Sequence, residues 1–99
     1  MTTYHLTVLS PVGEVFSGEV ISVLLRGAEG DLAVFAGHIP FVTTVKPGRC
    51  VITLADESEA EGELTTGILE VTKEGVRLLV GQKDAFEGLE HDTSLGINK

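Results

Sequence analysis

Apolar and polar side chains alternate at every second position along much of the chain. Between Glu19 and Arg26 the apolar positions of one face are Ile21, Val23 and Leu25. Between Arg49 and Ala55 the residues of one face are Cys50, Ile52 and Leu54. A period of two is typical of a β-strand with one buried face. No segment shows the period of about 3.6 residues that marks an amphipathic helix, so the pattern predicts an all-β chain without substantial helix.

Turn-forming residues separate these alternating segments at regular intervals. Twelve glycines are spread over 99 residues, and short strands punctuated in this way are typical of a β-sandwich or barrel. Strands are expected at ten segments: Tyr4–Ser10, Glu14–Phe16, Glu19–Arg26, Asp31–Phe35, Phe41–Val45, Arg49–Ala55, Glu63–Thr66, Ile68–Thr72, Val76–Val80 and Gly81–Glu87. Ser17-Gly18 is expected to end the second strand, and Gly67 to mark a bulge or a close approach of two backbones.

Acidic side chains are concentrated between Asp56 and Glu63, where five carboxylates occur. Because these like charges repel one another and favour water, Asp56–Gly62 is predicted to be the solvated tip of a hairpin. The run lacks the spaced ligands and the glycine of an EF-hand loop, so it does not predict calcium binding. Residues 89–99 hold few apolar side chains and are expected to be an irregular or mobile tail behind one domain, residues 1–88.

Composition and charge narrow the classes of partner. A chain of 99 residues with 42% hydrophobic residues, five aromatic residues and no tryptophan predicts one domain with an aliphatic core. The net charge of −8 argues against nucleic acid and against direct binding to an anionic lipid surface, since both need clustered lysine and arginine. An acidic surface suits a basic protein surface instead. The sequence has neither a signal-peptide pattern nor a membrane-spanning apolar run, which predicts membrane association only through partners.

Few residues in this sequence could carry chemistry. The histidines His5, His38 and His91 lack the local spacing of zinc ligands. A small enzyme or metal protein that uses His5, His38 and Cys50 is one hypothesis. Cys50 lies in an alternating strand, however, where a lone cysteine usually behaves as a small buried hydrophobic residue. We therefore predict no catalytic residue, no cofactor site and no metal site.

The stretch from Gly27 to Thr43 is the most unusual part of the chain. Two glycine-containing turns flank one short strand, and Pro40 restricts the backbone of the residue before it. One interpretation is an ordinary hairpin with Phe41 in the core. The other is a stiff loop that presents His38, Ile39 and Phe41 to a partner, because a stiff loop loses little entropy on binding. The residues alone leave both interpretations open.

Five collinear motifs resemble one known family, the epsilon subunit of F-type ATP synthase, in its N-terminal β-sandwich domain. The motifs cover about residues 4–88, and their order without large gaps makes the resemblance specific. They are Tyr4–Ser10, Phe16-Ser17-Gly18, Gly27–Thr43, Lys46-Pro47-Gly48 and Thr66–Val71. The resemblance implies a flattened β-sandwich of about ten short, mostly antiparallel strands. The family's C-terminal helical hairpin is expected to be missing after Leu89. The resemblance therefore implies neither inhibition of ATP hydrolysis nor ATP binding for this chain.

The resemblance also implies a function and partners. It implies a non-catalytic subunit of the central stalk, which binds the gamma subunit and the polar loops of the c-ring and couples ion-driven rotation to ATP synthesis. Its location would be peripheral, at the cytoplasmic face of the bacterial inner membrane or the equivalent organelle face. Glu29, Gly30 and Asp31 match the family loop that faces the c-ring.

The segment His38, Ile39, Pro40 and Phe41 matches a family region near gamma or the c-ring. Apolar residues that the core does not need, such as Leu24 or Phe41, are candidates for the face that meets gamma. The alternative hypothesis is a stand-alone β-sandwich module that binds an unrelated partner.

Overall fold

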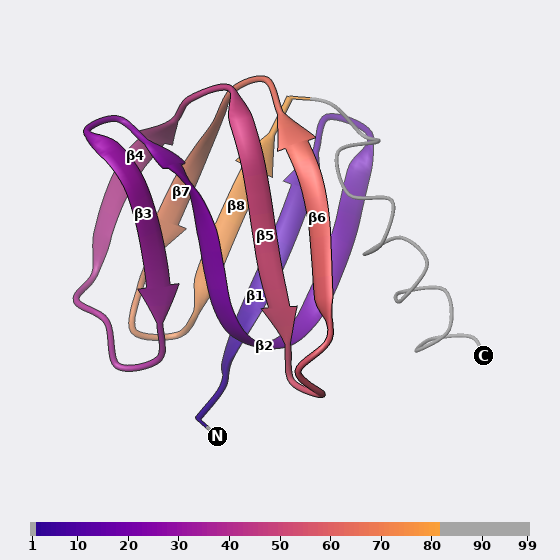
Figure 1. Cartoon of the computed structure of the whole chain (residues 1–99), viewed down its shortest axis with the longest axis vertical. Helices are drawn as coiled ribbons and strands as arrows, with labels where there is room; N and C mark the ends of the chain where they lie inside the picture. The colour runs from indigo at the N-terminus through magenta and orange to yellow at the C-terminus, as the bar shows by residue number, and fades with distance from the viewer. Residues whose placement is uncertain (1, 82–99) are drawn as a thin grey trace.

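Eight β-strands make up most of residues 2–81, the part of the chain that the computed structural model describes (Figure 1). They are β1 (Tyr4–Ser10), β2 (Gly13–Gly27), β3 (Gly30–Phe35), β4 (Phe41–Val45), β5 (Gly48–Leu54), β6 (Glu59–Leu64), β7 (Gly67–Val71) and β8 (Val76–Val80). The all-β prediction is confirmed. Ten strands were expected and eight are seen, because the expected strands Glu14–Phe16 and Glu19–Arg26 are both part of β2. The last expected strand, Gly81–Glu87, extends outside the described residues. The expected tail and the domain boundary at residue 88 also lie outside them.

Strand β2 shows why the predicted break at Ser17-Gly18 was wrong. A side chain at Gly18 would lie 2.9 Å from the ring of Phe16, so this glycine makes room for an aromatic ring inside a continuous strand. The pairing register of β2 shifts between Val20 and Ser22. The first half of β2 pairs with β1, and the second half pairs with β3 and β5. One strand therefore contributes to both layers of the fold.

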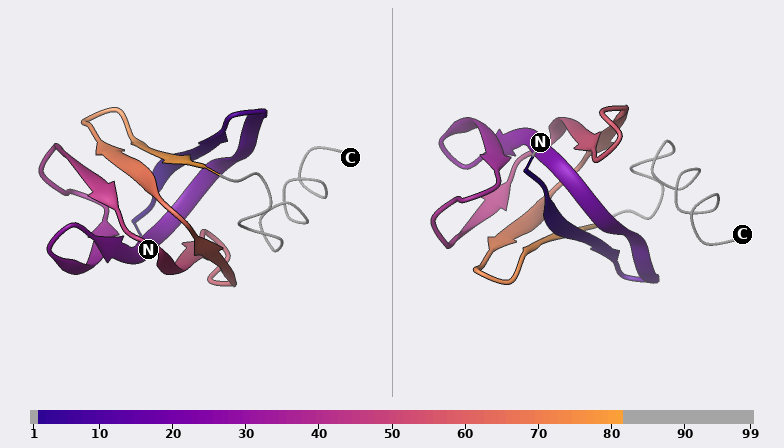
Figure 2. Two further views of the ribbon diagram at one scale, coloured as in Figure 1. Left: turned by 90° about the horizontal axis from the view of Figure 1, so that it is seen from above. Right: turned by 90° about the horizontal axis from the view of Figure 1, so that it is seen from below.

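Two layers face each other, as the edge-on views of Figure 2 show. The front layer consists of β3, the second half of β2, β5 and β6. The back layer consists of β4, β7, β8, β1 and the first half of β2. Every pairing is antiparallel except that between β1 and β8, which is parallel and joins the two ends of the described chain. The predicted sandwich is confirmed.

The core lies between the layers and is almost entirely aliphatic, as the composition predicts. Alternate residues of each strand point inward, and the largest fully buried side chains are Leu6, Leu25, Ile52, Leu69, Leu78, Val8, Val20, Val23, Val34 and Val71. Cys50 is also fully buried, as predicted. Gly67 marks a close backbone approach, because a side chain there would overlap the carbonyl oxygen of Leu79. Leu32, Ala36 and Phe41 are partly buried against the edge of the core.

The acidic run is mostly a strand, which corrects the prediction of a hairpin tip across Asp56–Gly62. The backbone N–H of Leu54 donates to the carbonyl oxygen of Ser58, and that of Glu57 donates to the carbonyl oxygen of Leu54. Strand β6 begins at Glu59. The alternation of charge with small residues is the physical reason: Glu59, Glu61 and Glu63 point to solvent, while Ala60 and Leu64 point into the core. Repulsion between the carboxylates is tolerated because only one face of β6 carries them.

Candidate docking surfaces

The turn between β2 and β3 carries the first predicted interface, Glu29, Gly30 and Asp31. Gly27 and Gly30 pair across the end of the hairpin, so that Ala28 and Glu29 form its corner. Gly30 has φ of 132°, a value that glycine adopts far more readily than other residues. Both carboxylates are exposed. Asp31 Oδ1 lies 3.6 Å from Nε of Arg26, and an ion pair this exposed contributes little to stability.

The loop between β3 and β4 carries the second predicted interface, His38, Ile39, Pro40 and Phe41. Ile39 is 80% exposed and Pro40 is exposed, whereas His38 and Phe41 are half-buried. Phe41 packs against the core from the start of β4. Phe41 supports the core, as the first interpretation states, while Ile39 projects into solvent from the same loop. That the loop meets a partner stays a prediction.

Tyr4 anchors this second loop, a role that the sequence did not indicate. Its hydroxyl donates a hydrogen bond to the carbonyl oxygen of Val34 at 2.7 Å. Its ring stands edge-on to that of His38, with centroids 5.4 Å apart. Nδ1 of His38 donates in turn to the carbonyl oxygen of Phe35 at 2.6 Å. Burial raises the pKa of the Tyr4 hydroxyl above its ordinary value of 10.0, so the hydroxyl stays a donor in mildly alkaline solution as well as at neutral pH. The only available signal was that Tyr4 is the single tyrosine of the chain.

The two predicted interfaces lie at opposite ends of β3. In Figure 1 the turn that precedes β3 is at the top of the sandwich, and the loop that follows β3 is at the bottom. Seven residue steps separate Gly30 from Gly37, which corresponds to about 23 Å along an extended strand. The fold therefore brings together the members of each segment, but it does not bring the two segments together.

Exposed apolar side chains lie on both outer faces of the sandwich. Six large apolar side chains are exposed in residues 2–81: Val12, Leu24, Phe35, Ile39, Val42 and Ile68. Leu24 and Phe35 lie on the outer face of the front layer, whereas Val42 and Ile68 lie on the paired strands β4 and β7 of the back layer. Leu24 is thus exposed and Phe41 packs against the core, and the face that meets a partner stays a prediction.

The residues of the enzyme or metal hypothesis are used structurally. His5 bonds Ser17 Oγ through Nε2 at 2.8 Å and lies 3.4 Å from Glu19 through Nδ1. Burial raises the pKa of the Cys50 thiol to about 12, so Cys50 carries almost no thiolate at neutral pH and is a poor nucleophile. Among residues 2–81 no three potential ligands are grouped closely enough to hold a metal ion; His91 falls outside that range.

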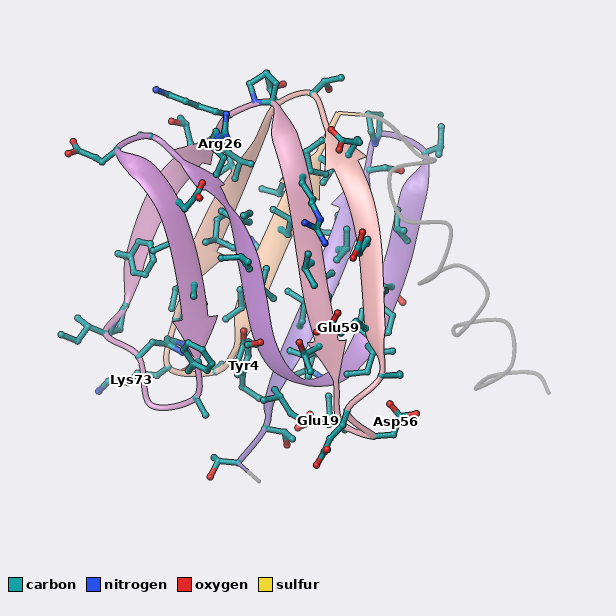
Figure 3. The ribbon with its side chains drawn as sticks, viewed as in Figure 1. Tyr4, Glu19, Arg26, Asp56, Glu59 and Lys73 are labelled. Carbon is teal, nitrogen blue, oxygen red and sulfur yellow. The ribbon has the colours of Figure 1, made fainter. Side chains whose placement is uncertain are left out.

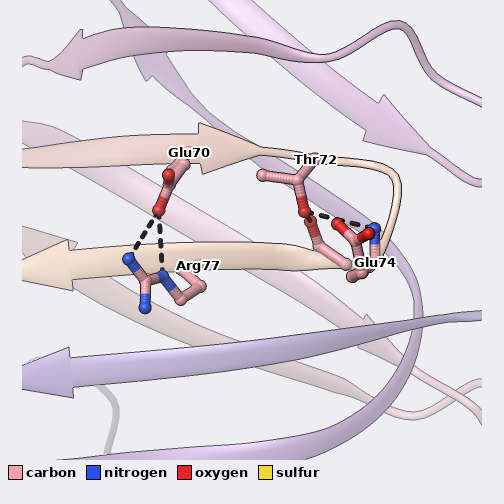
Figure 4. Close-up of polar contacts among 5 residues, drawn as sticks. Glu70, Thr72, Glu74 and Arg77 are labelled. Atoms are coloured by element: carbon pink, nitrogen blue, oxygen red, sulfur yellow. Dashed lines mark hydrogen bonds and ion pairs between the residues drawn. The ribbon is translucent and has the colours of Figure 1, made fainter.

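Near the turn between β7 and β8, the outer face of the back layer carries polar side chains that bond one another (Figure 4). Arg77 donates from Nε and Nη2 to Oε1 of Glu70, at 2.9 and 2.8 Å. The hydroxyl of Thr72 closes the next turn by bonding Gly75 and Glu74. A shallow hollow lies beside these residues and His5. Because Arg77 is already paired, the hollow offers no free cation for an anionic ligand.

Comparisons with known proteins agree with the fold. Residues 3–83 match the family described as ATP synthase, Delta/Epsilon chain, beta-sandwich domain. An ATP synthase epsilon chain from Rhodopseudomonas palustris is 38% identical over 90 residues, and one from Bradyrhizobium is 36% identical over 90 residues. Each alignment covers 91% of this chain and 66% of the relative. The chain thus spans just under two thirds of the length of these relatives.

Solved structures support the same fold at lower identity. A chain of the Euglena gracilis mitochondrial ATP synthase (OSCP/F1/c-ring) has a TM-score of 0.76 at 20% identity, covering 83% of this chain and 52% of that chain. A chain of the Tetrahymena thermophila mitochondrial ATP synthase (central stalk/c-ring) has a TM-score of 0.66 at 16% identity, covering 82% and 65%.

The fold is that of a two-layer β-sandwich. The family match, which covers most of the described residues, makes the assignment specific. The chain belongs to the family of ATP synthase delta/epsilon chain β-sandwich domains. No helix within residues 2–81 has the length and apolarity to cross a membrane.

Proposed function

We propose that this chain is a non-catalytic subunit of the central stalk of a rotary ATP synthase. The family match over residues 3–83 carries the proposal, and relatives named ATP synthase epsilon chain support it. In this role the domain binds the gamma subunit and the polar loops of the c-ring. It associates with the membrane only through the complex, at the cytoplasmic face of the bacterial inner membrane or the equivalent organelle face.

In this role the two ends of β3 contact different partners. The exposed acids Glu29 and Asp31 face basic side chains of the c-ring loops, where charges at a contact rim set register and association rate. The loop His38–Phe41 lies at the other end of β3, about 23 Å away along the strand, so the two segments are presented at opposite ends of the sandwich. The loop is therefore assigned to gamma, with Ile39 as the apolar anchor.

A dense sandwich suits the transmission of torque. Protein interiors are packed like organic crystals and deform little under load. The two layers share β2, and the parallel pairing of β1 with β8 joins the first and last strands of the described residues. A force applied at the turn before β3 is thus carried through a closed hydrogen-bonded structure to the loop after it.

Charge reversal at the turn tests the coupling role. In reconstituted ATP synthase, Glu29→Lys combined with Asp31→Lys should lower ATP-driven ion pumping several-fold while leaving the domain folded. The matched control is Glu57→Lys with Glu59→Lys, which makes the same change of charge two residues apart at exposed sites near the turn between β5 and β6. Equal pumping by the test and wild-type enzymes would refute the role of this turn.

A further inference from the structure

The outer face of the front layer changes in character from one side to the other. Three rows of side chains cross its four strands, in the registers of β3 with β2, β2 with β5 and β5 with β6. The rows are Phe35–Ser22–Thr53–Glu59, Ala33–Leu24–Val51–Glu61, and Asp31 with Arg26 followed by Arg49 with Glu63. The β3 side is apolar in its two lower rows, and the β6 side is acidic in all three.

The apolar part of this face is open to solvent. Phe35 is 58% exposed and Leu24 is 45% exposed, while Val51 is half-buried between them and β6. Side chains of the same strands that point the other way, such as Val23 and Val34, are buried. The core is therefore complete without Leu24 and Phe35, and their exposure is not needed for folding.

The acidic part is only partly neutralised. Arg49 pairs with Glu61 through a 2.6 Å contact between Nη2 and Oε2. This bond raises the pKa of Arg49, and the charges of Glu59 and Glu63 act in the same direction. Within residues 2–81 the carboxylates of Glu59 and Glu63 take part in no hydrogen bond or ion pair of their own. Two negative charges are left beside an apolar strip.

A hollow lies over the middle and upper rows of the face, lined by Leu24, Leu25, Arg26, Asp31, Arg49 and Val51. Figure 3 looks onto this face, with Arg26 toward its upper end and Glu59 toward its lower end. The four strands span about 14 Å at a spacing of about 4.8 Å, and an α-helix with its side chains is about 10–12 Å wide. One helix laid along the strands would cover the apolar strip and reach β6.

We propose that the outer face of the front layer binds an amphipathic helix of a partner protein. The apolar stripe of the helix covers Phe35, Leu24 and Val51, and lysine or arginine side chains on its flank meet Glu59 and Glu63. Charge complementarity selects this occupant: the acids disfavour an anionic lipid surface and an acidic helix. The proposal is independent of the proposed ATP synthase role, because its test uses no component of that complex.

Peptide binding to the full 99-residue chain tests this inference. The probe is a leucine–lysine helical peptide of about 18 residues, five turns, with an apolar stripe and lysine flanks; its partner probe has glutamate in place of lysine. Fluorescence anisotropy should show binding of the lysine peptide and at least about tenfold weaker binding of the glutamate peptide. Glu59→Gln with Glu63→Gln should weaken binding of the lysine peptide about fivefold or more. Leu24→Ser with Phe35→Ser should weaken its binding about tenfold or more.

Matched variants separate this face from general attraction to an acidic protein. Glu14→Gln with Glu74→Gln removes the same charge elsewhere, and Val12→Ser with Ile68→Ser removes exposed apolar groups elsewhere. Both controls should bind the lysine peptide as wild type does. Equal losses in the test and control pairs, or no binding by wild type, would overturn the proposal. Circular dichroism of each variant checks the fold, and NMR shift changes confined to the back layer would also contradict it.

Discussion

The two connections of strand β3 differ in how they are held. The turn before β3 is a tight hairpin closed by Gly27 and Gly30, and an exposed pair between Arg26 and Asp31 is its one side-chain ion pair within residues 2–81. The loop after β3 is longer and is tied to the core by Tyr4 and by the half-buried Phe41. Charge is presented from a short backbone turn, whereas an apolar side chain is presented from an anchored loop. An apolar contact gains affinity from preorganisation, while a charged rim needs little of it.

Replacing Tyr4, which anchors the loop after β3, should cause the largest loss of stability. Tyr4→Ala is expected to lower the free energy of unfolding by about 3–5 kcal/mol, as for other buried aromatic residues. Tyr4→Phe should cost about 1–2 kcal/mol, because it removes the hydrogen bond to Val34 and keeps the ring. Urea unfolding measures both, and amide hydrogen exchange should show faster opening of residues 36–40 in Tyr4→Phe but no change at residues 27–30. Equal exchange in both segments would mean that Tyr4 does not anchor the loop.

Alkaline pH should lower the stability of the fold through the buried thiol of Cys50. The Cys50 pKa is about 12 in the folded chain against a reference of 9.0. Above pH 9 the unfolded chain loses this proton first, so its contribution to stability is complete below pH 9 and falls as the pH rises toward 12. By pH 11 the loss is about 2–3 kcal/mol. Urea unfolding from pH 8 to 11 should show this slope in wild type and a smaller one in Cys50→Ala; identical slopes would show that the thiol is not responsible.

Replacing the glycine in each connection by alanine should cause a loss of stability of intermediate size, and the two losses should differ. Gly30 has φ of 132° and Gly37 has φ of 83°, and a side chain would have open space at both. Alanine reaches angles near that of Gly37 at about 1 kcal/mol, but the angle of Gly30 lies farther from any region open to it, so Gly30→Ala should cost about 2 kcal/mol or more. Thermal unfolding of the two variants provides the comparison. A larger loss in Gly37→Ala would reverse it.

Charge reversal at the turn should have the smallest effect on stability. Glu29→Lys with Asp31→Lys should change the free energy of unfolding by no more than about 0.5 kcal/mol, since both groups are exposed and the ion pair with Arg26 is weak. Urea unfolding at low and moderate salt measures it. A loss above about 2 kcal/mol would show that the turn is a structural element, and the coupling experiment could then no longer separate docking from folding.

Local patterns in the sequence predicted much of the fold because each depends on neighbouring residues. The alternation in β5 placed Cys50 and Ile52 in the core, and the glycines located the turn before β3. Gly18 was misinterpreted because its partner is the ring of Phe16 and not a turn. In β6, glutamates at every second position concealed a strand pattern whose inward residues are small.

Long-range contacts could not be predicted in the same way. The parallel pairing of β1 with β8 joins residues about 70 positions apart, and Tyr4 bonds Val34 across 30 positions. Neither contact has a local signature. For the same reason, the resemblance could assign Glu29–Asp31 and His38–Phe41 to an interface, but only the fold separates them to opposite ends of β3. Their roles in docking remain a prediction.

Cross-linking in the assembled ATP synthase tests the central claim most directly. The native Cys50 is fully buried with a raised pKa, so it should not react with the cross-linker. Single reactive cysteines can therefore be introduced at other positions without replacing it. Glu29→Cys and Ile39→Cys are treated with a short thiol-to-amine cross-linker, and the products are identified by mass spectrometry. The account predicts that Glu29→Cys links to the c-ring and Ile39→Cys links to gamma. The same subunit captured from both positions, or neither partner from either one, would contradict it.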